Sequence, residues 1–154
     1  MGVRTQLTTA IKQAMRDKAA ARLSTLRLMN AAFKDRDIAA RGEGREDGVT
    51  EDELLAILGK MVKQRRESAK SYEEAGRLDL AEQELGEITV IEEFLPRALN
   101  DDEVAKAVEA ALAEVEATSI RDMGRVMGVL KAKHTGRMDF GAVGPMVKAR
   151  LSGG

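Results

Sequence analysis

The sequence predicts an all-α protein in which a unit of four helices is followed by a small three-helix C-terminal bundle. Apolar residues recur at three- and four-residue spacing along the chain, and no stretch alternates apolar and polar residues as a half-buried strand does. The 154 residues include three Phe, one Tyr and no Trp, so Ala, Leu, Val, Ile and Met must fill the interior. Such side chains suit closely packed helices better than packed sheets.

Two apolar stripes predict the first two helices. They are Val3, Leu7, Ile11 and Ala14, followed by Arg22, Leu26, Met29 and Phe33. The aliphatic part of Arg22 can lie along apolar surface while its guanidinium stays in water. Three glycines and several charges between residues 41 and 48 predict an exposed loop after the second helix.

Capping patterns predict where the next two helices begin. Thr50 stands three residues before Glu53, so each side chain can accept a hydrogen bond from the backbone N–H of the other residue. Gly76 is expected just after the end of this third helix, because glycine tolerates positive φ. Asp79 and Glu82 repeat the capping-box spacing and are expected to open the fourth helix.

Pro96 marks the expected boundary between two domains. Proline removes a backbone donor and restricts the residue before it, so the fourth helix, whose apolar face runs to Leu95, should stop there. The predicted domains are an N-terminal helical domain, residues 1–96, and a three-helix domain, residues 97–154. The second has about 55 residues, near the lower limit for a core that is stable alone.

Further capping pairs predict the helices of the second domain. Asn100 with Glu103 should begin the fifth helix, and Ser119 with Asp122 should begin the sixth. The last helix should include Val143, Val147 and Leu151. Its start is left open by the Gly-Pro pair at 144–145, because proline is comfortable only in the first turn.

Charge is segregated along the chain, although the net charge is -1. Residues 1–41 carry nine Lys or Arg against three Asp or Glu, residues 82–118 carry two against eleven, and residues 119–154 carry seven against two. One interpretation is that these runs neutralise one another in the folded protein. The other is that a basic face meets an anionic partner such as RNA.

Composition excludes several classes of site. The chain has no cysteine, which excludes disulfides, a thiolate nucleophile and a cysteine-based zinc site. The N-terminus has no apolar run typical of a signal peptide, and no segment approaches about 18 uninterrupted apolar residues. The predicted location is therefore cytoplasmic, without membrane association.

Six short motifs follow one another along nearly the whole chain. They are LRLMNAA at 26–32, QRRES at 64–68, AGRLDLA at 75–81, FLP at 94–96, DMGRVMG at 122–128 and GRMD at 136–139. This ordered set resembles the YqeY family, small bacterial proteins related to the C-terminal tail of the GatB subunit of tRNA-dependent amidotransferases. The Gly-Pro pair at 144–145 departs from the pattern typical of similar proteins.

The resemblance implies an all-α fold with a C-terminal bundle similar to the GatB tail, which is the part that contacts tRNA. Ammonia production and transfer belong to other domains and subunits of the amidotransferase. We therefore expect a non-catalytic, tRNA-linked binding module whose partner is tRNA or an amidotransferase-related protein. The alternatives are an amidotransferase-associated carbon-nitrogen ligase activity with glutamine as amido-N-donor, an accessory subunit, or a helical protein-interaction module.

No catalytic, metal or cofactor site is predicted. Amidotransfer needs a Ser or Cys activated by a base, together with an oxyanion hole. The chain has no Cys, one His and no Ser-containing amidase signature. Adjacent acids at 92–93 and 101–102 point in different directions on a helix, so acid–base work or Mg²⁺ binding by these pairs is disfavoured.

The predicted sixth helix contains the residues for which a functional role is expected. Gly124 and Gly128 lie on one helical face, and each costs about 1 kcal/mol relative to Ala inside a helix. That cost points to close approach, either by a neighbouring helix of the bundle or by a ligand such as the RNA sugar-phosphate chain. The predicted nucleic-acid-binding residues around this face are Arg121, Arg125, Lys131, Lys133, His134 and Arg137.

Two features refine this expectation. His134 stands at the expected C-terminus of the helix, where it more readily interacts with free carbonyls than with a metal. RNA readers often add exposed aromatic side chains for stacking, and Phe140 is the nearest aromatic residue in the sequence. The shortage of aromatic residues favours recognition of the RNA backbone or shape over reading of its sequence.

Overall fold

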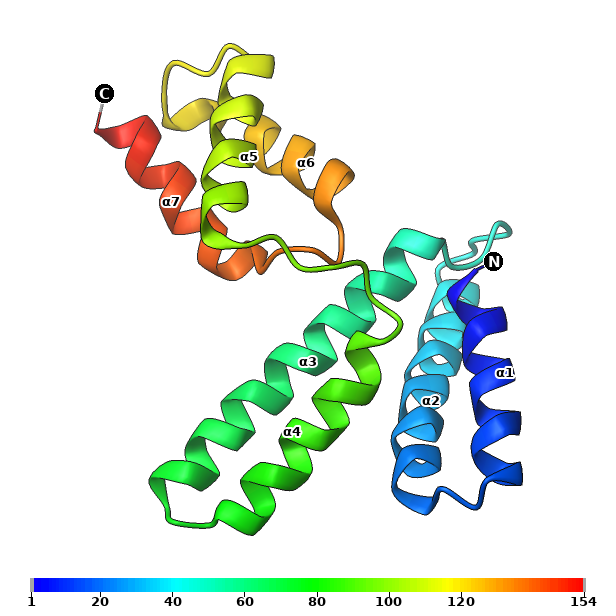
Figure 1. Cartoon of the computed structure of the whole chain (residues 1–154). Coiled ribbons are helices and arrows are strands. Elements are labelled where there is room, and N and C mark those ends of the chain that lie inside the picture. Colours follow the sequence, from blue (N-terminus) through cyan, green and yellow to red (C-terminus); the bar gives the residue numbers. More distant parts are fainter. Residues whose placement is uncertain (1, 154) are drawn as a thin grey trace. The chain divides into compact units, whose positions relative to one another are not determined.

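The computed structural model describes residues 2–153, and in that range it contains helices and no strand, which confirms the all-α prediction (Figure 1). The helices are α1 (Val3–Arg16), α2 (Ala20–Gly42), α3 (Glu51–Glu74), α4 (Leu78–Glu92), α5 (Asp101–Glu114), α6 (Met123–His134) and α7 (Phe140–Ser152), with a 3-10 turn, η1 (Ile120–Asp122), before α6.

The helices form two compact units, Met1–Leu95 and Pro96–Gly154. This division falls one residue before the boundary expected from Pro96. Each unit has a separate cluster of buried apolar side chains. That the two units are separate domains stays a prediction.

The first unit pairs α1 with α2 and α3 with α4 as two antiparallel hairpins (Figure 1). Its centre lies where all four helices supply apolar side chains. Phe33, Leu26 and Leu58 are at most 1% exposed, as is Ile91 near the end of α4. The two N-terminal stripes are confirmed as core-facing, and the buried members of this core are Val3, Leu7, Ala14, Leu26, Met29, Phe33, Leu54, Leu58, Met61, Val62, Ile88 and Ile91.

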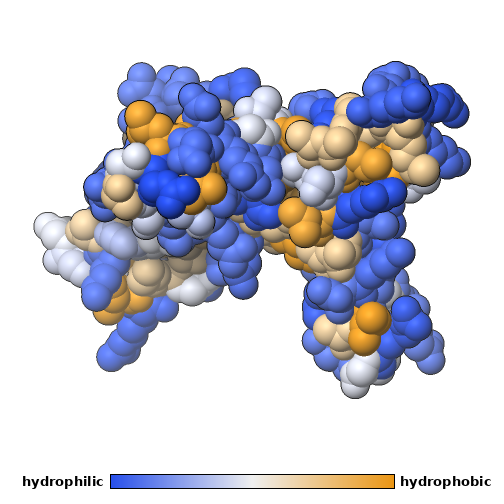
Figure 2. Space-filling model, turned by 90° about the horizontal axis from the view of Figure 1, so that it is seen from below, coloured by the Kyte–Doolittle hydropathy of each residue, from blue (hydrophilic) through white to orange (hydrophobic). Residues whose placement is uncertain are grey.

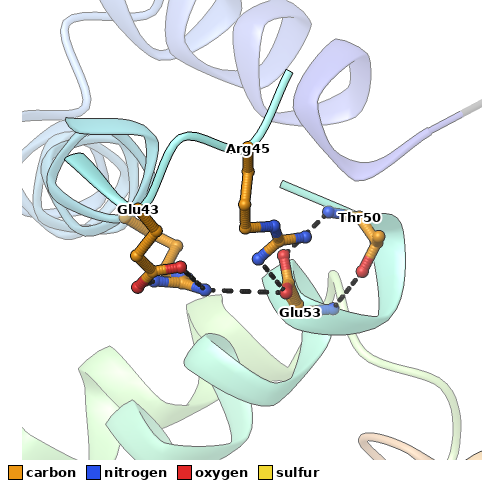
Figure 3. Close-up of polar contacts among 5 residues, drawn as sticks. Glu43, Arg45, Thr50 and Glu53 are labelled. Atoms are coloured by element: carbon orange, nitrogen blue, oxygen red, sulfur yellow. Dashed lines mark hydrogen bonds and ion pairs between the residues drawn. The ribbon is translucent and has the colours of Figure 1, made fainter. Parts of the chain in front are cut away.

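The capping box at the start of α3 is confirmed. Glu53 N–H donates to Thr50 Oγ1 at 3.2 Å, and Thr50 N–H donates to Glu53 Oε2 at 3.0 Å. Glu53 also joins a cluster of charges that spans the preceding loop (Figure 3). Arg45 donates to Glu53 at 2.5 Å, and Arg36 reaches both Glu43 and Glu53. The loop between α2 and α3 is thereby tied at both ends.

Gly76 ends α3 as predicted, with φ of +75°. The N–H of Arg77 donates to the carbonyl oxygen of Tyr72 at 2.8 Å, and the N–H of Gly76 donates to that of Glu73 at 3.1 Å. These two bonds form a Schellman motif, which requires a residue with positive φ at the glycine position.

The predicted cap of α4 by Asp79 is wrong. The helix begins at Leu78, and its N-cap residue, Arg77, makes no side-chain capping bond. The Schellman turn explains the difference, because it reverses the chain within two residues and leaves Arg77 as the first residue free to cap. Asp79 lies in the first turn, and its carboxylate pairs with Arg77.

The end of α4 also differs from the prediction. The helix ends at Glu92, and Phe94 and Leu95 lie in the following turn, where both pack against the core. Glu93 accepts two hydrogen bonds from Arg22 of α2, at 2.6 and 3.1 Å. This ion pair links the start of α2 to the end of α4, and Arg22 is partly buried.

The second unit packs α5, α6 and α7 around six buried side chains, which are Val108, Ala111, Val126, Leu130, Val143 and Val147. The capping boxes predicted at Asn100 with Glu103 and at Ser119 with Asp122 are both present. The second box opens the 3-10 turn η1, and α6 continues from it.

Helix α7 begins before the Gly-Pro pair. Asp139 is its N-cap residue, and its Oδ1 accepts a hydrogen bond from the N–H of Gly141 at 2.9 Å. Pro145 therefore lies inside the helix, at its sixth position. The start of α7 could not be predicted from Pro145, because the proline lies inside the helix. The signal that marks the start is Asp139, which caps it.

Candidate nucleic-acid interface

Helix α6 has a buried face and an open face. Val126 and Leu130 are at most 1% exposed and join the core of the second unit. Gly124 and Gly128 are exposed, and a Cβ atom added at either position would meet no described atom within 4 Å. Close packing of these glycines against another helix of the bundle is therefore excluded as the reason for their presence.

Small residues share this exposed side of the helix. Ala132 follows Gly128 by four residues and is also exposed, so a strip without large side chains runs along α6. Lys131 of α6 and Arg121 of the turn η1 just before it are exposed as well, and neither side chain forms an ion pair with any residue in 2–153. We call these five residues the open face of α6; the sequence analysis had singled out all of them except Ala132.

Arg125 lies at the edge of the open face and is engaged locally. Its Nη2 donates to Asp122 Oδ1 at 2.8 Å and to the carbonyl oxygen of Val115 at 3.2 Å. The side chain is nevertheless 62% exposed. An exposed ion pair of this kind contributes little to stability, so the guanidinium can exchange its partner for an external anion.

Asp122 is held in its charged form. Its carboxylate accepts hydrogen bonds from the backbone N–H groups of Thr118 and Ser119 at 2.8 and 3.1 Å. The bond from Thr118, then the guanidinium of Arg125, then the bond from Ser119 lower the pKa of Asp122 to about 2. Asp122 therefore places a fixed negative charge beside Arg125 at neutral pH.

Lys133 faces away from the open face and toward α5. Its Nζ donates to Glu114 at 2.6 Å, with both side chains about half exposed. Arg150 of α7 pairs in the same way with Glu109 of α5. Some of the acidic charges of α5 and the basic charges of α6 and α7 are thus neutralised within this unit. The cations of the open face are not among them.

Arg137 has a structural contact. Its Nε donates to the carbonyl oxygen of Arg97 at 2.9 Å, and its own carbonyl oxygen accepts a hydrogen bond from the N–H of Leu99 at 2.8 Å. The turn between α6 and α7 is thereby attached to the segment that enters α5. This predicted RNA contact is half-buried and already bonded.

His134 supplies no positive charge at neutral pH. Burial, and then the nearby charges of Arg137 and Lys133, lower the pKa of His134 below its ordinary value. Its Nδ1 is buried and makes no hydrogen bond with any described residue. The carbonyl oxygen of Lys131 accepts instead from the Thr135 hydroxyl, so the predicted histidine contact to helix-end carbonyls is not seen at this position.

No group of three or more His, Asp or Glu side chains in residues 2–153 is arranged to hold a metal ion. None of the helices there combines the length and apolar character that crossing a membrane requires. Two shallow hollows lie on α2 and α3 of the first unit.

These features define a class of two-unit helical protein in which the C-terminal bundle exposes a basic, glycine-bearing helix. Comparison with known families gives the particular group. The profile of the family described as Yqey-like protein matches residues 4–151, nearly the whole chain. The chain belongs to the YqeY family, as the ordered motifs predicted.

Two curated relatives are both fungal proteins named "Altered inheritance of mitochondria protein 41, mitochondrial". The protein of Clavispora lusitaniae is 34% identical over 110 residues, 70% of this chain and 61% of the relative. The protein of Meyerozyma guilliermondii is 38% identical over 87 residues, 55% of this chain and 42% of the relative. The chain thus spans less than two thirds of the length of either relative.

The names of these relatives assign a mitochondrial location to those two proteins. These names do not test the cytoplasmic location or the bacterial origin expected for this chain, and both stay predictions. The similarity of the second unit to the amidotransferase tail also stays a prediction.

Proposed function

We propose that this chain is a non-catalytic RNA-binding module and that the open face of α6 contacts the sugar-phosphate backbone of tRNA. The proposal depends above all on one observation. Gly124 and Gly128 are exposed, nothing in the described chain approaches them, and cations without intramolecular partners flank them.

The glycines support the proposal because their cost has no structural explanation within the unit. Each exposed glycine in a helix interior destabilises it by about 1 kcal/mol relative to alanine. Alanine would fit at both positions without a clash. Because glycine has no side chain, a polymer backbone can approach the helix more closely at these two positions than it could at any other residue type.

The charges support an anionic partner. Arg121 and Lys131 have no ion pair to break, and Arg125 is exposed enough to turn toward a phosphate. Phosphate contacts position a protein on nucleic acid without reading its sequence. Because α6 has no aromatic residue for base stacking, the proposed contact is with the backbone.

A titration of purified full-length chain with tRNA over a range of salt concentrations tests the proposal. Each phosphate neutralised changes the slope of log affinity against log salt by about -0.7 to -0.9. Arg121→Glu combined with Lys131→Glu should weaken binding and flatten that slope. Lys60→Glu combined with Lys106→Glu reverses the same number of exposed charges elsewhere and is the matched control.

Salt-independent binding, no binding, or equal losses in both double variants would contradict the proposed interface. The amidotransferase alternative is separated in the same preparation. Release of ammonia from glutamine, or conversion of mischarged tRNA when the chain is added to a reconstituted mixture, would favour an enzymatic or accessory role over a binding module.

A further inference from the structure

Large apolar side chains are exposed on two helices of the first unit that also have opposite charge. The exposed fractions are 44% for Leu28 and 63% for Ile38 on α2, and 64% for Leu78 and 45% for Leu85 on α4. Figure 2 shows such apolar patches interrupting an otherwise hydrophilic surface. Helix faces of this kind are typical of protein contacts.

The outer face of α2 is hollowed at its N-terminal end. A shallow depression of about 380 Å³ is lined by Ala20, Leu23, Ser24, Arg27 and Leu28. Its small residues leave room for a side chain from outside, and its leucines provide apolar contact. Ala31, seven residues after Ser24 on the same exposed face, leaves a second open position along the helix.

Cations form a row beside this face. Arg27, Lys34 and Arg41 are exposed and stand seven residues apart, which places them on one side of α2 at about 10.5 Å intervals. None of the three forms an ion pair with a residue in 2–153. The outer face of α2 is therefore complementary to a helix that combines leucines with carboxylates.

Helix α4 presents such a surface. Leu78 and Leu85 are also seven residues apart, and Glu82 lies between them. Glu82 is exposed and has no ion-pair partner among the described residues. We call Leu78, Glu82 and Leu85 the outer ridge of α4.

From this match we infer that the outer ridge of α4 in one molecule docks, antiparallel, on the outer face of α2 in a second copy of the chain. Equal spacing fixes the register. With Leu85 in the hollow at Ser24, Leu78 comes to lie over Ala31, and Glu82 falls beside Arg27. The small residues of α2 leave room for the leucines of α4, so that the ridge of one helix packs into the groove of the other.

The same contact is not available within one molecule. There α2 approaches α4 at Arg22 and Glu93, at the C-terminal end of α4, whereas Leu78 begins that helix. Both faces belong to the first unit, so the inference is independent of the second unit and of RNA binding. Because each molecule has one face of each kind, association can continue beyond a dimer unless a ring closes.

Sedimentation of the full chain from micromolar to millimolar concentration gives the first test. We expect reversible association that Arg27→Glu or Glu82→Lys weakens by about tenfold or more, because each places like charges together. The double variant Arg27→Glu with Glu82→Lys restores an opposite pair and should recover association. Lys106→Glu and Glu74→Lys, which change the same charges elsewhere, are the controls and should leave it unchanged.

Disulfide trapping gives the second test, since the natural chain has no cysteine. A Ser24→Cys variant is mixed with a Leu85→Cys variant under mild oxidation. Docking in the inferred register should yield mainly the mixed disulfide between the two variants. A chain that stays monomeric throughout, together with a statistical mixture of disulfides, would overturn the inference, even if the cations of α2 bound RNA.

Discussion

Arg137 Nε donates a hydrogen bond to the carbonyl oxygen of Arg97 at 2.9 Å, across 40 residues of sequence. With the bond from Leu99 N–H to the carbonyl oxygen of Arg137, it closes the second unit by joining its first segment to the turn before α7. A residue that sequence reasoning assigned to RNA contact therefore has a role in the fold.

Arg137→Gln is expected to destabilise the second unit by about 1 kcal/mol, because a half-buried hydrogen bond to a carbonyl oxygen is lost. Thermal unfolding measured by circular dichroism checks this. Arg121→Gln removes a comparable charge that has no contact and should leave the midpoint unchanged. Equal effects of the two substitutions would contradict the structural role of Arg137.

Gly124→Ala combined with Gly128→Ala should separate stability from binding. The double variant is expected to raise the free energy of unfolding by about 1 kcal/mol, mostly through Gly128, because both methyl groups enter open space but Gly124 lies in the first turn of α6. If the RNA backbone approaches these glycines, tRNA affinity should fall at the same time. Chemical denaturation and a tRNA titration measure the two effects on one sample.

Gly86→Ala is the control for that experiment. It lies within α4, and a Cβ there also meets nothing within 4 Å, so it should stabilise the chain without changing tRNA affinity. Unchanged tRNA affinity in the α6 double variant would remove the close-approach role of its glycines while leaving the charge argument to be tested separately.

His134 should make the stability of the protein depend on pH below its unfolded pKa of about 6.5. Its folded pKa is lowered, so below pH 6.5 the unfolded chain binds more protons than the folded chain does. Stability is then complete above pH 6.5 and declines as the pH falls toward the folded pKa. His134→Gln, which removes the only histidine, should flatten the dependence of stability on pH just below pH 6.5.

Asp122 takes part in a capping box with Ser119, whereas Asp79 does not cap α4 as predicted, so substitutions of the two aspartates should differ in effect. Asp122→Asn should lower the unfolding midpoint at pH 7, because the carboxylate accepts two backbone bonds and pairs with Arg125. Its folded pKa of about 2 lies below the unfolded value, so this contribution is present above about pH 4 and is lost toward pH 2. Asp79→Asn should have a small effect, and a larger loss there would contradict the observed start of α4.

Gly76→Val should destabilise the hairpin of α3 and α4. A β-branched residue at φ of +75° is strained by about 2 kcal/mol, and the Schellman bonds of Arg77 depend on that conformation. Gly76→Asn is the milder control, since asparagine visits this region more readily. Similar denaturation midpoints for valine and asparagine would show that the turn does not need positive φ.

Helix capping rules predicted the structure best where a single residue satisfies the backbone groups at a helix end. Thr50 and Asn100 cap the helices they were expected to cap, and Gly76 ends α3. Ser119 caps the 3-10 turn η1, from which α6 continues. These tasks depend on bonds within four residues. The core stripes were also predictable, because helical period alone brings their members to one face.

The same rules failed where a neighbouring element took precedence. The Schellman turn precedes the start of α4, where Asp79 does not cap. Phe94 and Leu95 lie after the end of α4 and pack against the core from the following turn. Not all of the cations predicted to bind RNA are free to do so, because some of them bond to distant segments of the chain. Lys133 and Arg137 found partners in segments 19 and 40 residues away, which spacing along α6 does not reveal.

Local backbone chemistry and the ordered motifs were enough to predict the helical class, the limits of α3, the start of α5 and the YqeY family. The tertiary structure alone decided which features of α6 are available to a partner. For Gly124 and Gly128 the sequence left two kinds of close approach open, and packing against another helix of the bundle was excluded when no described atom was found near them. Exposure depends on which surfaces the rest of the chain covers, and that is settled only when distant segments pack.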